Sequence, residues 1–343
     1  MTILVTGAAG FIGSNFVLDW LSQSEEDVVS LDLLTYAGNI KNLSSVIRNS
    51  HHHFVQGSIS DHNLIIRLLK EYQIRAVIHF AAETHVDRSI HAPKNFIQTN
   101  IVGTYDLLES VKMYWNALNR DLKKNFRFLH VSTDEVYGSL QEKAILFSES
   151  HPYHPNNPYS ASKAASDHLV RAWFQTYQLP VLTTNCSNNY GPYQLPDKLI
   201  PMCILKALQD VSIPIYGNGK QIRDWIFVID HCNAIREVLN KGRIGETYNI
   251  GSWNEQTNLE VAEIICTTLD ELKPRSDNRS YCDQIILVKD RPGHDMRYAI
   301  DASKIERELE WKAKEKFETG LRKTVIWYLE NQSWIDGIVP NAK

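Results

Sequence analysis

The stretch ILVTGAAGFIGSNFV (3–17) constrains the fold of this chain more than any other. It reads as a buried strand, a loop that carries Gly7, Gly10 and Gly13, and the start of a helix. Glycine lets such a loop turn tightly and lets backbone amides approach a phosphate, and the helix N-terminus adds positive potential. The pattern predicts a dinucleotide-binding unit, with GxxGxxG in place of the usual GxGxxG spacing. A glycine-rich turn without a ligand is the alternative.

An acid at the end of the second strand supports the nucleotide interpretation. The strand at 28–31 is followed by Asp32, about twenty residues after the glycine loop, where a carboxylate accepts hydrogen bonds from adenosine-ribose hydroxyls. An acid at this position repels a 2′-phosphate, and no arginine lies directly beside it. The sequence therefore favours NAD over NADP as the cofactor.

Strands and helices alternate through the first half of the chain. Apolar runs predict strands at 3–6, 28–31, 54–56, 76–80, 126–131 and 181–185. Helical spacing of apolar residues predicts helices at 13–21, 63–72, 99–112 and 159–177. This alternation is typical of an α/β fold with a doubly wound, Rossmann-type parallel sheet.

The amino-acid composition of the chain changes after residue 185. The following loops are rich in Asn, Pro and Gly, and helices are expected at 200–209, 259–272 and 320–331. We expect residues 1–185, together with about 224–243, to form the NAD-binding domain. Residues 186–223 and 244–343 are expected to form a smaller, discontinuous C-terminal substrate domain.

Composition excludes several classes of protein. The 343 residues carry a formal net charge of −4 without a basic stripe, which argues against nucleic-acid or anionic-membrane partners. No apolar run is long enough to span a membrane, and no signal peptide is expected. The run of histidines at 51–53 is expected to be a polar lead-in to a strand, so no metal site is predicted. The five scattered cysteines indicate reduced thiols and a cytoplasmic protein.

A tyrosine and a lysine lie four residues apart at the start of the helix at 159–177. Tyr159 and Lys163 form a YxxxK pattern, and this spacing places both side chains on one helix face. A nearby ammonium stabilises a phenolate, so we expect Lys163 to lower the pKa of Tyr159 toward a usable range for a base. A half-buried tyrosine beside a surface lysine is the alternative.

Two adjacent acids follow the strand at 126–131, in the stretch HVSTDEVYG (130–138). Ligands of a doubly wound sheet bind beyond the carboxyl ends of its strands, where Thr133, Asp134 and Glu135 are expected. The S-x-x-E spacing of Ser132 and Glu135 allows helix capping as an alternative, although the residues after them are poor helix formers. An acid and a base side by side indicate an elimination, in which one takes a proton from carbon and the other protonates a leaving hydroxyl.

These motifs, taken together and in order, resemble a known family. TGAAGFIG, Asp32, FAAETHVDRSI (80–90), HVSTDEVYG, PYSASKAASDHLV (158–170), TNCSNNYGP (184–192) and YGNGKQIRDW (216–225) are similar to the extended short-chain dehydrogenases/reductases, and most closely to the dTDP-glucose 4,6-dehydratases. GETYNIG (245–251) and DRPGHDMRYAIDASKI (290–305) extend the similarity to nearly the whole chain. The T-D-E triplet beside YxxxK is the most specific part.

The resemblance implies a lyase reaction and a role for each catalytic residue. Tyr159, assisted by Lys163, takes the C4 hydroxyl proton of the sugar while NAD accepts the C4 hydride, and Thr133 binds the C4 oxygen. Glu135 then removes the acidified C5 proton, and protonated Asp134 donates to the departing C6 hydroxyl. Reduction at C6 yields dTDP-4-keto-6-deoxyglucose and regenerates a cofactor that stays bound. Burial and the charge of Glu135 are expected to raise the pKa of Asp134.

The same resemblance implies two sets of binding residues. The set for NAD comprises Gly7, Gly10, Phe11, Ile12, Gly13, Asp32, Leu33, Thr35, Ser58, Ile59, Phe80, Ala81, Ala82, Thr84, Thr99, Tyr159, Lys163 and Asn189. The set for the sugar nucleotide comprises Thr84, Thr133, Asn188, Lys198, Leu199, Pro214, Tyr216, Arg223, Asn258, Arg291 and His294. Ser58 departs from the family, which usually has an aspartate there that reads the adenine amino group, so its effect on NAD affinity is open.

Several alternatives remain at this point. Another sugar-nucleotide 4,6-dehydratase or a 4-epimerase of the same fold would share most of these motifs, although the acid pair argues against an epimerase. A redox-sensing NAD-binding regulator would need neither YxxxK nor the acid pair. Thymidine and uridine are not distinguished, and rhamnose and other deoxysugar pathways share this step. Apolar residues in excess on the helices at 99–112 and 159–177 predict a homodimer.

Overall fold

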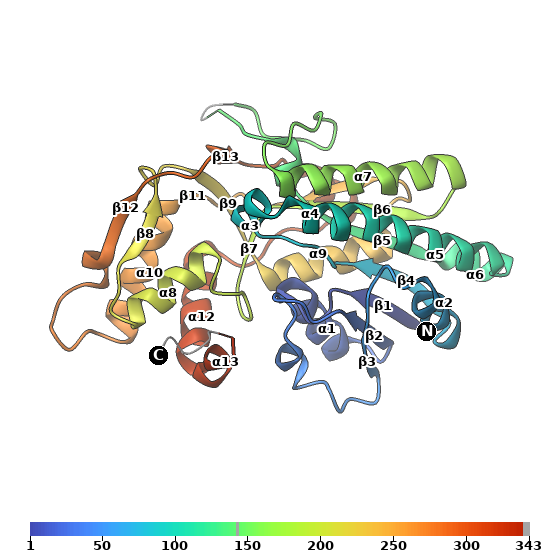
Figure 1. Ribbon diagram of the computed structural model, residues 1–343, viewed down its shortest axis with the longest axis horizontal. Helices are drawn as coiled ribbons and strands as arrows, with labels where there is room; N and C mark the ends of the chain where they lie inside the picture. Colours follow the sequence, from blue (N-terminus) through green and yellow to red (C-terminus); the bar gives the residue numbers. More distant parts are fainter. Residues whose placement is uncertain (142–143, 339–343) are drawn as a thin grey trace.

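A seven-stranded parallel sheet forms the larger part of the molecule. The computed structural model describes residues 1–141 and 144–338. The strand order is β10-β6-β5-β4-β1-β2-β3, and every neighbouring pair is parallel. The bounds are β1 (Thr2–Thr6), β2 (Asp27–Asp32), β3 (His52–Gln56), β4 (Ile74–His79), β5 (Arg127–Thr133), β6 (Val181–Cys186) and β10 (Thr247–Ile250). The predicted doubly wound Rossmann-type sheet is confirmed (Figure 1).

Helices cover both faces of this sheet. Alternate residues of β1 enter different cores, because successive strand side chains point to opposite faces. Ile3 and Val5 pack with α1 (Phe11–Gln23) and α9 (Val228–Lys241). Leu4 packs on the other face with residues of α2 (His62–Glu71), α5 (Thr104–Ala117) and α7 (Pro158–Tyr177). The helix expected at 99–112 begins with a π-helical segment, Ile97–Gly103, before α5.

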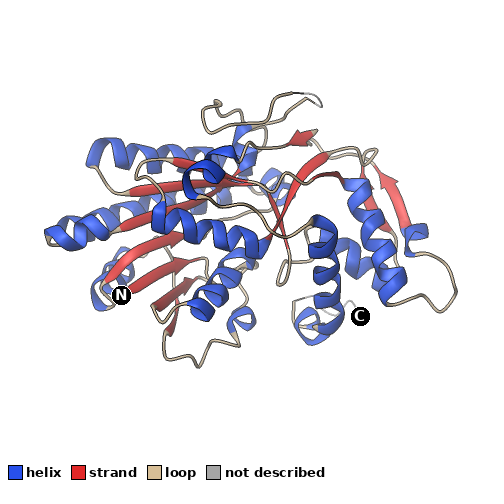
Figure 2. Ribbon diagram, turned by 180° about the vertical axis from the view of Figure 1, so that it is seen from behind, coloured by secondary structure: helices blue, strands red, loops and turns tan. Residues whose placement is uncertain are grey.

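The remaining chain forms a smaller unit with its own core, seen beside the large sheet in Figure 2. One small sheet joins β7 (Asn188–Tyr190), β9 (Ile222–Phe227), β11 (Glu255–Thr257) and β13 (Arg297–Tyr298), and β8 (Ile213–Tyr216) pairs with β12 (Ile285–Val288). The helices are α8 (Leu199–Leu208), α10 (Asn258–Leu272), α12 (Phe317–Glu330) and α13 (Gln332–Asp336). Shorter helices α3 (Val86–His91), α4 (Pro93–Phe96), α6 (Arg120–Asn125) and α11 (Ser303–Leu309) complete the fold.

The expected domain boundaries need two corrections. β9 lies in the smaller sheet, although residues 224–243 were expected in the first domain. β10 pairs with β6 at the edge of the larger sheet, although residue 244 was expected to begin the second part of the substrate domain. Both strands are short, and nothing in a run of four to six residues indicates which sheet it joins, because strand pairing is a long-range contact.

The three histidines at 51–53 have separate partners. His51 Nδ1 lies 2.7 Å from Asp27 Oδ1, His52 Nε2 lies 2.9 Å from Ser30 Oγ, and the His53 ring packs beside Tyr72. Within the described residues no group of three potential ligands is placed to hold a metal ion. No helix in that same part of the chain is both long and apolar enough to cross a membrane.

Candidate active site

A cavity of about 500 Å³ opens at the carboxyl ends of the large sheet's strands. Its walls come from the glycine loop, the ends of β2, β4, β5 and β6, the first turns of α7, and the segment before α8. Every residue expected to contact NAD lines this cavity. Four residues expected to contact the sugar nucleotide line it as well, namely Thr84, Thr133, Asn188 and Lys198.

The glycine loop has the geometry of a phosphate cradle. Gly7 has a φ of +68°, and a Cβ on it would lie 2.6 Å from the Ala81 nitrogen. A Cβ on Gly13 would lie 2.2 Å from the Gly7 oxygen, so the helix can approach the loop only without a side chain there. Gly10 is the N-cap of α1 and supplies no side-chain cap, which leaves backbone amides of the first turn free for an anion.

Asp32 is held at the rim of the second strand by two backbone amides. Its Oδ2 accepts from Ala9 N at 2.9 Å, and its Oδ1 accepts from Leu34 N at 2.7 Å. Burial raises the pKa of the carboxyl, and these two hydrogen bonds oppose the rise. Each oxygen keeps a further lone pair, so the carboxylate can still accept ribose hydroxyls. Ser58 Oγ accepts from Ser60 N at 3.1 Å and lines the cavity beside it.

The two adjacent acids occupy different environments. β5 ends at Thr133, and a 3₁₀ turn follows over Asp134–Tyr137. Asp134 is only 2% exposed, and its Oδ2 has no hydrogen-bond partner among the described residues. Burial, and then the charges of Glu135 and Asp224, raise the pKa of the Asp134 carboxyl well above its usual range. This shift favours the protonated form of Asp134, which is the direction that the sequence predicts.

Glu135 is half-buried and faces α7. Its Oε2 accepts a hydrogen bond from Ser160 Oγ at 3.0 Å. The alternative in which Ser132 caps a helix names the wrong residue. The cap of the 3₁₀ turn is Thr133, whose Oγ1 accepts a hydrogen bond from Glu135 N at 3.3 Å. Ser132 Oγ instead donates to Asp167 Oδ2 at 2.9 Å. The end of β5 and the 3₁₀ turn thus place a threonine hydroxyl and two carboxyl groups side by side.

Tyr159 and Lys163 lie on the same face of α7, but their electrostatics differ from the prediction. Burial, Glu135 and Cys186 raise the pKa of Tyr159 well above its usual value, with a hydrogen bond to Thr133 opposing the rise. Lys163 Nζ donates to the Val131 carbonyl at 2.8 Å, and burial lowers the pKa of this ammonium. The expected lowering of the phenol pKa is therefore wrong for this structure, because burial is the largest cause and it raises the pKa together with the charge of Glu135.

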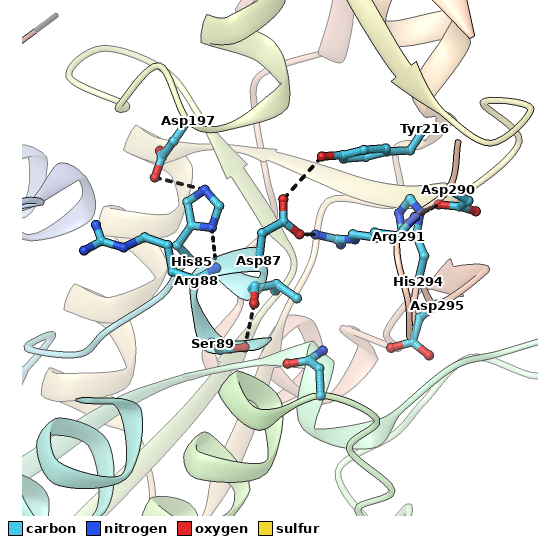
Figure 3. A network of polar contacts seen from close by, with 12 residues as sticks. His85, Asp87, Arg88, Ser89, Asp197, Tyr216, Asp290, Arg291, His294 and Asp295 are labelled. Carbon is cyan, nitrogen blue, oxygen red and sulfur yellow. Dashed lines mark hydrogen bonds and ion pairs between the residues drawn. The ribbon is translucent and has the colours of Figure 1, made fainter. Parts of the chain in front are cut away.

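Three of the residues expected to bind the sugar nucleotide cluster outside the cavity. Arg291 Nη1 lies 2.8 Å from Asp87 Oδ1, and Tyr216 Oη lies 3.5 Å from Asp87 Oδ2 (Figure 3). His294 Nδ1 lies 2.6 Å from Asp290 Oδ1, with its ring 6.1 Å from that of Tyr216. The cluster therefore joins α3 of the large domain to the loop before β13.

The other expected sugar-nucleotide residues flank this cluster. Arg223 is 5% exposed, donates to the Asp295 carbonyl at 3.0 Å and lies 4.3 Å from the centre of the Tyr298 ring. Lys198 Nζ donates to the Thr84 carbonyl at 3.0 Å. Burial lowers the pKa of both cations, and Arg291 is among the smaller causes that lower it further, so Arg291 interacts electrostatically with both. Leu199 begins α8, Pro214 lies on β8 and Asn258 begins α10; none of these three lines the cavity.

Sequence reasoning missed several residues of the cavity wall. Tyr36 lines it, with the Arg88 guanidinium 3.5 Å from its ring centre. Cys186 lies at the end of β6, and its thiol, expected only to pack, donates to the Ser132 carbonyl at 3.3 Å. The rule that ligands bind beyond strand ends could have found Cys186. Gln98, Gln194 and Asp197 also line the cavity without any local sequence signal.

The parallel sheet, the glycine cradle, Asp32 and the Tyr–Lys pair beside an acid pair define an extended short-chain dehydrogenase/reductase that acts on nucleotide sugars. The family model described as "GDP-mannose 4,6 dehydratase" matches residues 4–324. A dTDP-glucose 4,6-dehydratase of Xanthomonas campestris is 60% identical, covering 99% of this chain and 97% of that protein. One from Salmonella typhimurium is 54% identical, covering 100% and 96%. The chain belongs to the dTDP-glucose 4,6-dehydratase family.

Solved structures agree with this assignment. A dTDP-glucose 4,6-dehydratase of Bacillus anthracis in complex with NAD has a TM-score of 0.87 at 45% identity, covering 99% of this chain and 100% of that one. The enzyme of Streptomyces venezuelae with NAD and TYD bound has a TM-score of 0.90 at 44% identity, with the same coverage. A UDP-glucose 4-epimerase of Thermotoga maritima shares the fold, with a TM-score of 0.84, at only 26% identity over 97% of this chain and 100% of that one.

Proposed function

We propose that the chain converts dTDP-glucose to dTDP-4-keto-6-deoxyglucose and water, with NAD as a resident cofactor. The observation that carries the proposal is the pair formed by buried Asp134, whose pKa is raised by burial and by Glu135, and half-buried Glu135 at the cavity wall. An acid and a base at consecutive positions match an elimination, which needs both at once. A 4-epimerase moves a hydride at C4 and has no leaving hydroxyl to protonate.

The residues present fit NAD. The Gly7–Gly13 loop leaves room and free amides for a pyrophosphate, and Asp32 has lone pairs for the adenosine ribose. Tyr159 and Lys163 line the same cavity. When bound, the oxidised nicotinamide supplies a positive charge, the oxidation at C4 of the sugar and the later reduction at C6.

Tyr159 and Thr133 act on the C4 oxygen of the sugar. The phenol of Tyr159 lies beside Thr133, and the Thr133 hydroxyl opposes the rise in the pKa of Tyr159. Once ionised, Tyr159 takes the C4 hydroxyl proton while Thr133 donates a hydrogen bond to the oxygen that becomes the ketone. Lys163, anchored on the Val131 carbonyl, keeps its ammonium near the site in a buried position.

Glu135 and Asp134 carry out the elimination. Glu135 removes the C5 proton, which the C4 ketone has made acidic, and the electron pair is held as the enolate. This pair then forms the C5–C6 double bond as the C6–O bond breaks. Asp134 gives its proton to the departing hydroxyl, which leaves as water. Glu135 returns its proton to C5 when C6 is reduced. The proton gained by Tyr159 and the proton lost by Asp134 balance over one turnover.

Three positively charged side chains can bind the diphosphate of the substrate. Arg291 interacts electrostatically with both Arg223 and Lys198, and arginine forms bidentate hydrogen bonds with phosphate oxygens. We assign the diphosphate to these three side chains and the remaining sugar-nucleotide contacts to the residues expected from the sequence, with a thymidine base.

A homodimer is part of the proposal. The π-helical segment, α5 and α7 expose large apolar side chains to solvent, among them Ile97 at 52%, Tyr105 at 46%, Met113 at 55% and Tyr177 at 44%. Such a face is stabilised by pairing with a second copy across a two-fold axis. The cytoplasmic location also stays a prediction, based on five free cysteines.

Turnover of dTDP-glucose in D2O tests the function. We expect loss of one water and one deuterium at C5 of the product, as measured by mass spectrometry and NMR. Tyr159→Phe is expected to stop the reaction before any reduced nicotinamide absorbance develops, since the C4 hydroxyl then keeps its proton. A product of unchanged mass, inverted at C4, would overturn the proposal in favour of an epimerase.

A further inference from the structure

Ser160 joins the proposed base to the start of α7. Its hydroxyl is completely buried and lies 3.0 Å from Glu135 Oε2 and 3.0 Å from Asn157 Oδ1. Asn157 is the N-cap of α7, and its Oδ1 also accepts from Ser160 N at 2.9 Å. The oxygen of the Asn157 amide is therefore identified by its own hydrogen bond, because an NH₂ group there could not accept.

One hydroxyl hydrogen thus faces two acceptors at equal distance. A serine hydroxyl donates one hydrogen bond and accepts others, so it can satisfy only one of these oxygens at a time. The Asn157 oxygen never donates, whereas Glu135 is an acceptor when ionised and gains a donor when protonated. The orientation of the hydroxyl must therefore follow the protonation state of Glu135.

We propose that Ser160 is a positioning residue for the C5 proton transfer, and that its hydroxyl turns between Glu135 and Asn157 as Glu135 gains and loses the proton. The inference rests on the proposed role of Glu135 as the C5 base. With Glu135 ionised, Ser160 donates to Oε2 and holds the carboxylate in place. With Glu135 protonated, the carboxylic O–H donates to Ser160 Oγ, and the serine hydrogen turns to Asn157 Oδ1.

The proton balance closes at each stage. The C5–H bond breaks, its electron pair stays on the sugar as the enolate, and the proton forms an O–H bond on Glu135. Ser160 keeps its own hydrogen and changes only its acceptor, so no charge moves along α7. Reprotonation at C5 reverses the same rotation. Both protonation states of Glu135 therefore keep one hydrogen bond without movement of a heavy atom.

Other groups around Glu135 do not replace this hydrogen bond. The titratable and charged side chains that interact electrostatically with it are Asp134 on its own turn, Tyr159 on α7, Lys198 before α8, Arg223 on β9 and Tyr298 on β13. Lys198 and Arg223 direct their hydrogen bonds to backbone carbonyls instead. Ser160 is the side chain that donates directly to the carboxylate in the described part of the chain.

Exchange of the C5 hydrogen of the product with solvent measures the proton transfer to and from Glu135 separately from the other steps. The holoenzyme is incubated with the 4-keto-6-deoxy product in D2O, and deuterium uptake at C5 is followed by NMR. We expect Ser160→Ala to slow the exchange about tenfold or more, because a hydrogen bond to a charged group is lost. The acid limb of its pH profile is expected to move upward by roughly one unit, because the ionised base loses its donor.

Matched variants separate positioning from folding. Ser160→Thr keeps the hydroxyl and is expected to restore the exchange rate and the pH profile. Ser166→Ala removes another buried hydroxyl from α7, which donates to the Lys163 carbonyl and does not contact Glu135. The pH profile of the Ser166→Ala variant is expected to match that of the unmodified enzyme. Asn157→Asp retains a good N-cap but adds a carboxylate that competes for the Ser160 hydrogen, so slower exchange is expected.

The outcomes distinguish this inference from the proposed function. If the unmodified enzyme neither dehydrates dTDP-glucose nor exchanges C5, the proposed function fails. If it does both while Ser160→Ala exchanges at the same rate with the same pH profile, the role of Ser160 is wrong. Should Ser160→Ala not fold, an unchanged exchange rate in Asn157→Asp would overturn the rotation.

Discussion

The Arg291 guanidinium and the Asp87 carboxylate form an ion pair of 2.8 Å across the two parts of the molecule, between residues 204 positions apart. Asp87 lies on α3, beside the wall of the cavity, and Arg291 lies in the loop that follows β12. Both side chains are partly exposed, so the pair itself stabilises the fold by no more than about 1 kcal/mol. The larger consequence of the pair concerns substrate binding. Asp87 is bound to Arg291, a cation that we assign to the substrate diphosphate.

The first prediction concerns this competition. Asp87→Asn is expected to lower the KM for dTDP-glucose by about two- to fivefold, because it releases Arg291 and removes a negative charge near the diphosphate. Steady-state kinetics at fixed ionic strength measure the change. Asp210→Asn, which removes the 2.7 Å ion pair with Arg275 instead, serves as the control. A higher KM for Asp87→Asn would mean that Asp87 orients Arg291 for binding.

The acid pair supports a second prediction. Replacement of both acids, Asp134→Asn with Glu135→Gln, is expected to slow water loss at least a hundredfold, the usual contribution of general acid–base catalysis. Oxidation at C4 should persist, visible as absorbance of the reduced nicotinamide, because Tyr159 and Lys163 are untouched. Water loss at the rate of the unmodified enzyme would show that other groups supply the acid and the base.

Asp167 leads to a third prediction, on stability and pH. This buried carboxylate accepts from Ser132 Oγ at 2.9 Å and lies 3.1 Å from His130 Nε2, and burial raises its pKa from 3.8 to about 6. The folded state therefore holds the proton more tightly than the unfolded state. Stability from this group is complete below pH 3.8 and is lost as pH rises through about 6.

Asp167→Asn removes this titration. Relative to the unmodified protein, the variant is expected to gain up to about 3 kcal/mol of unfolding free energy as pH rises from about 4 to 6. Urea unfolding across that range measures the difference. Asp61→Asn, at the exposed N-cap of α2, serves as the control. Parallel pH curves for Asp167→Asn and the unmodified protein would contradict the assignment.

The glycine loop offers a fourth prediction with an internal control. Gly7→Ala is expected to destabilise the protein by at least about 2 kcal/mol, because Gly7 has a φ of +68° and a Cβ would lie 2.6 Å from backbone. Gly10→Ala should cost much less, because its φ is −75° and its Cβ would meet only the Gly7 oxygen at 3.3 Å. Equal unfolding free energies for the two variants would show that the loop does not need Gly7.

Much of the fold and of the cavity wall is predictable from local patterns. Alternating apolar runs and helical spacings depend on neighbours within one element, so β1, β5 and α7 can be recognised directly. Parallel strands present their carboxyl ends at one edge of a sheet, and this rule alone predicts that the glycine loop, Asp32 and Asp134 lie close together. Family resemblance extends the prediction to every residue of the cofactor set that lines the cavity.

Local patterns in the chain are therefore sufficient to predict the sheet, the glycine cradle and the presence of an acid pair beside a Tyr–Lys pair. The tertiary structure alone decided the sheet to which β10 belongs, the direction of the pKa shift at Tyr159, the choice of Thr133 over Ser132 as the cap, and the contacts of Ser160 with Glu135 and of Arg291 with Asp87. The reason is physical. Local patterns report backbone geometry, whereas burial, charge and hydrogen bonding depend on groups that only folding brings together.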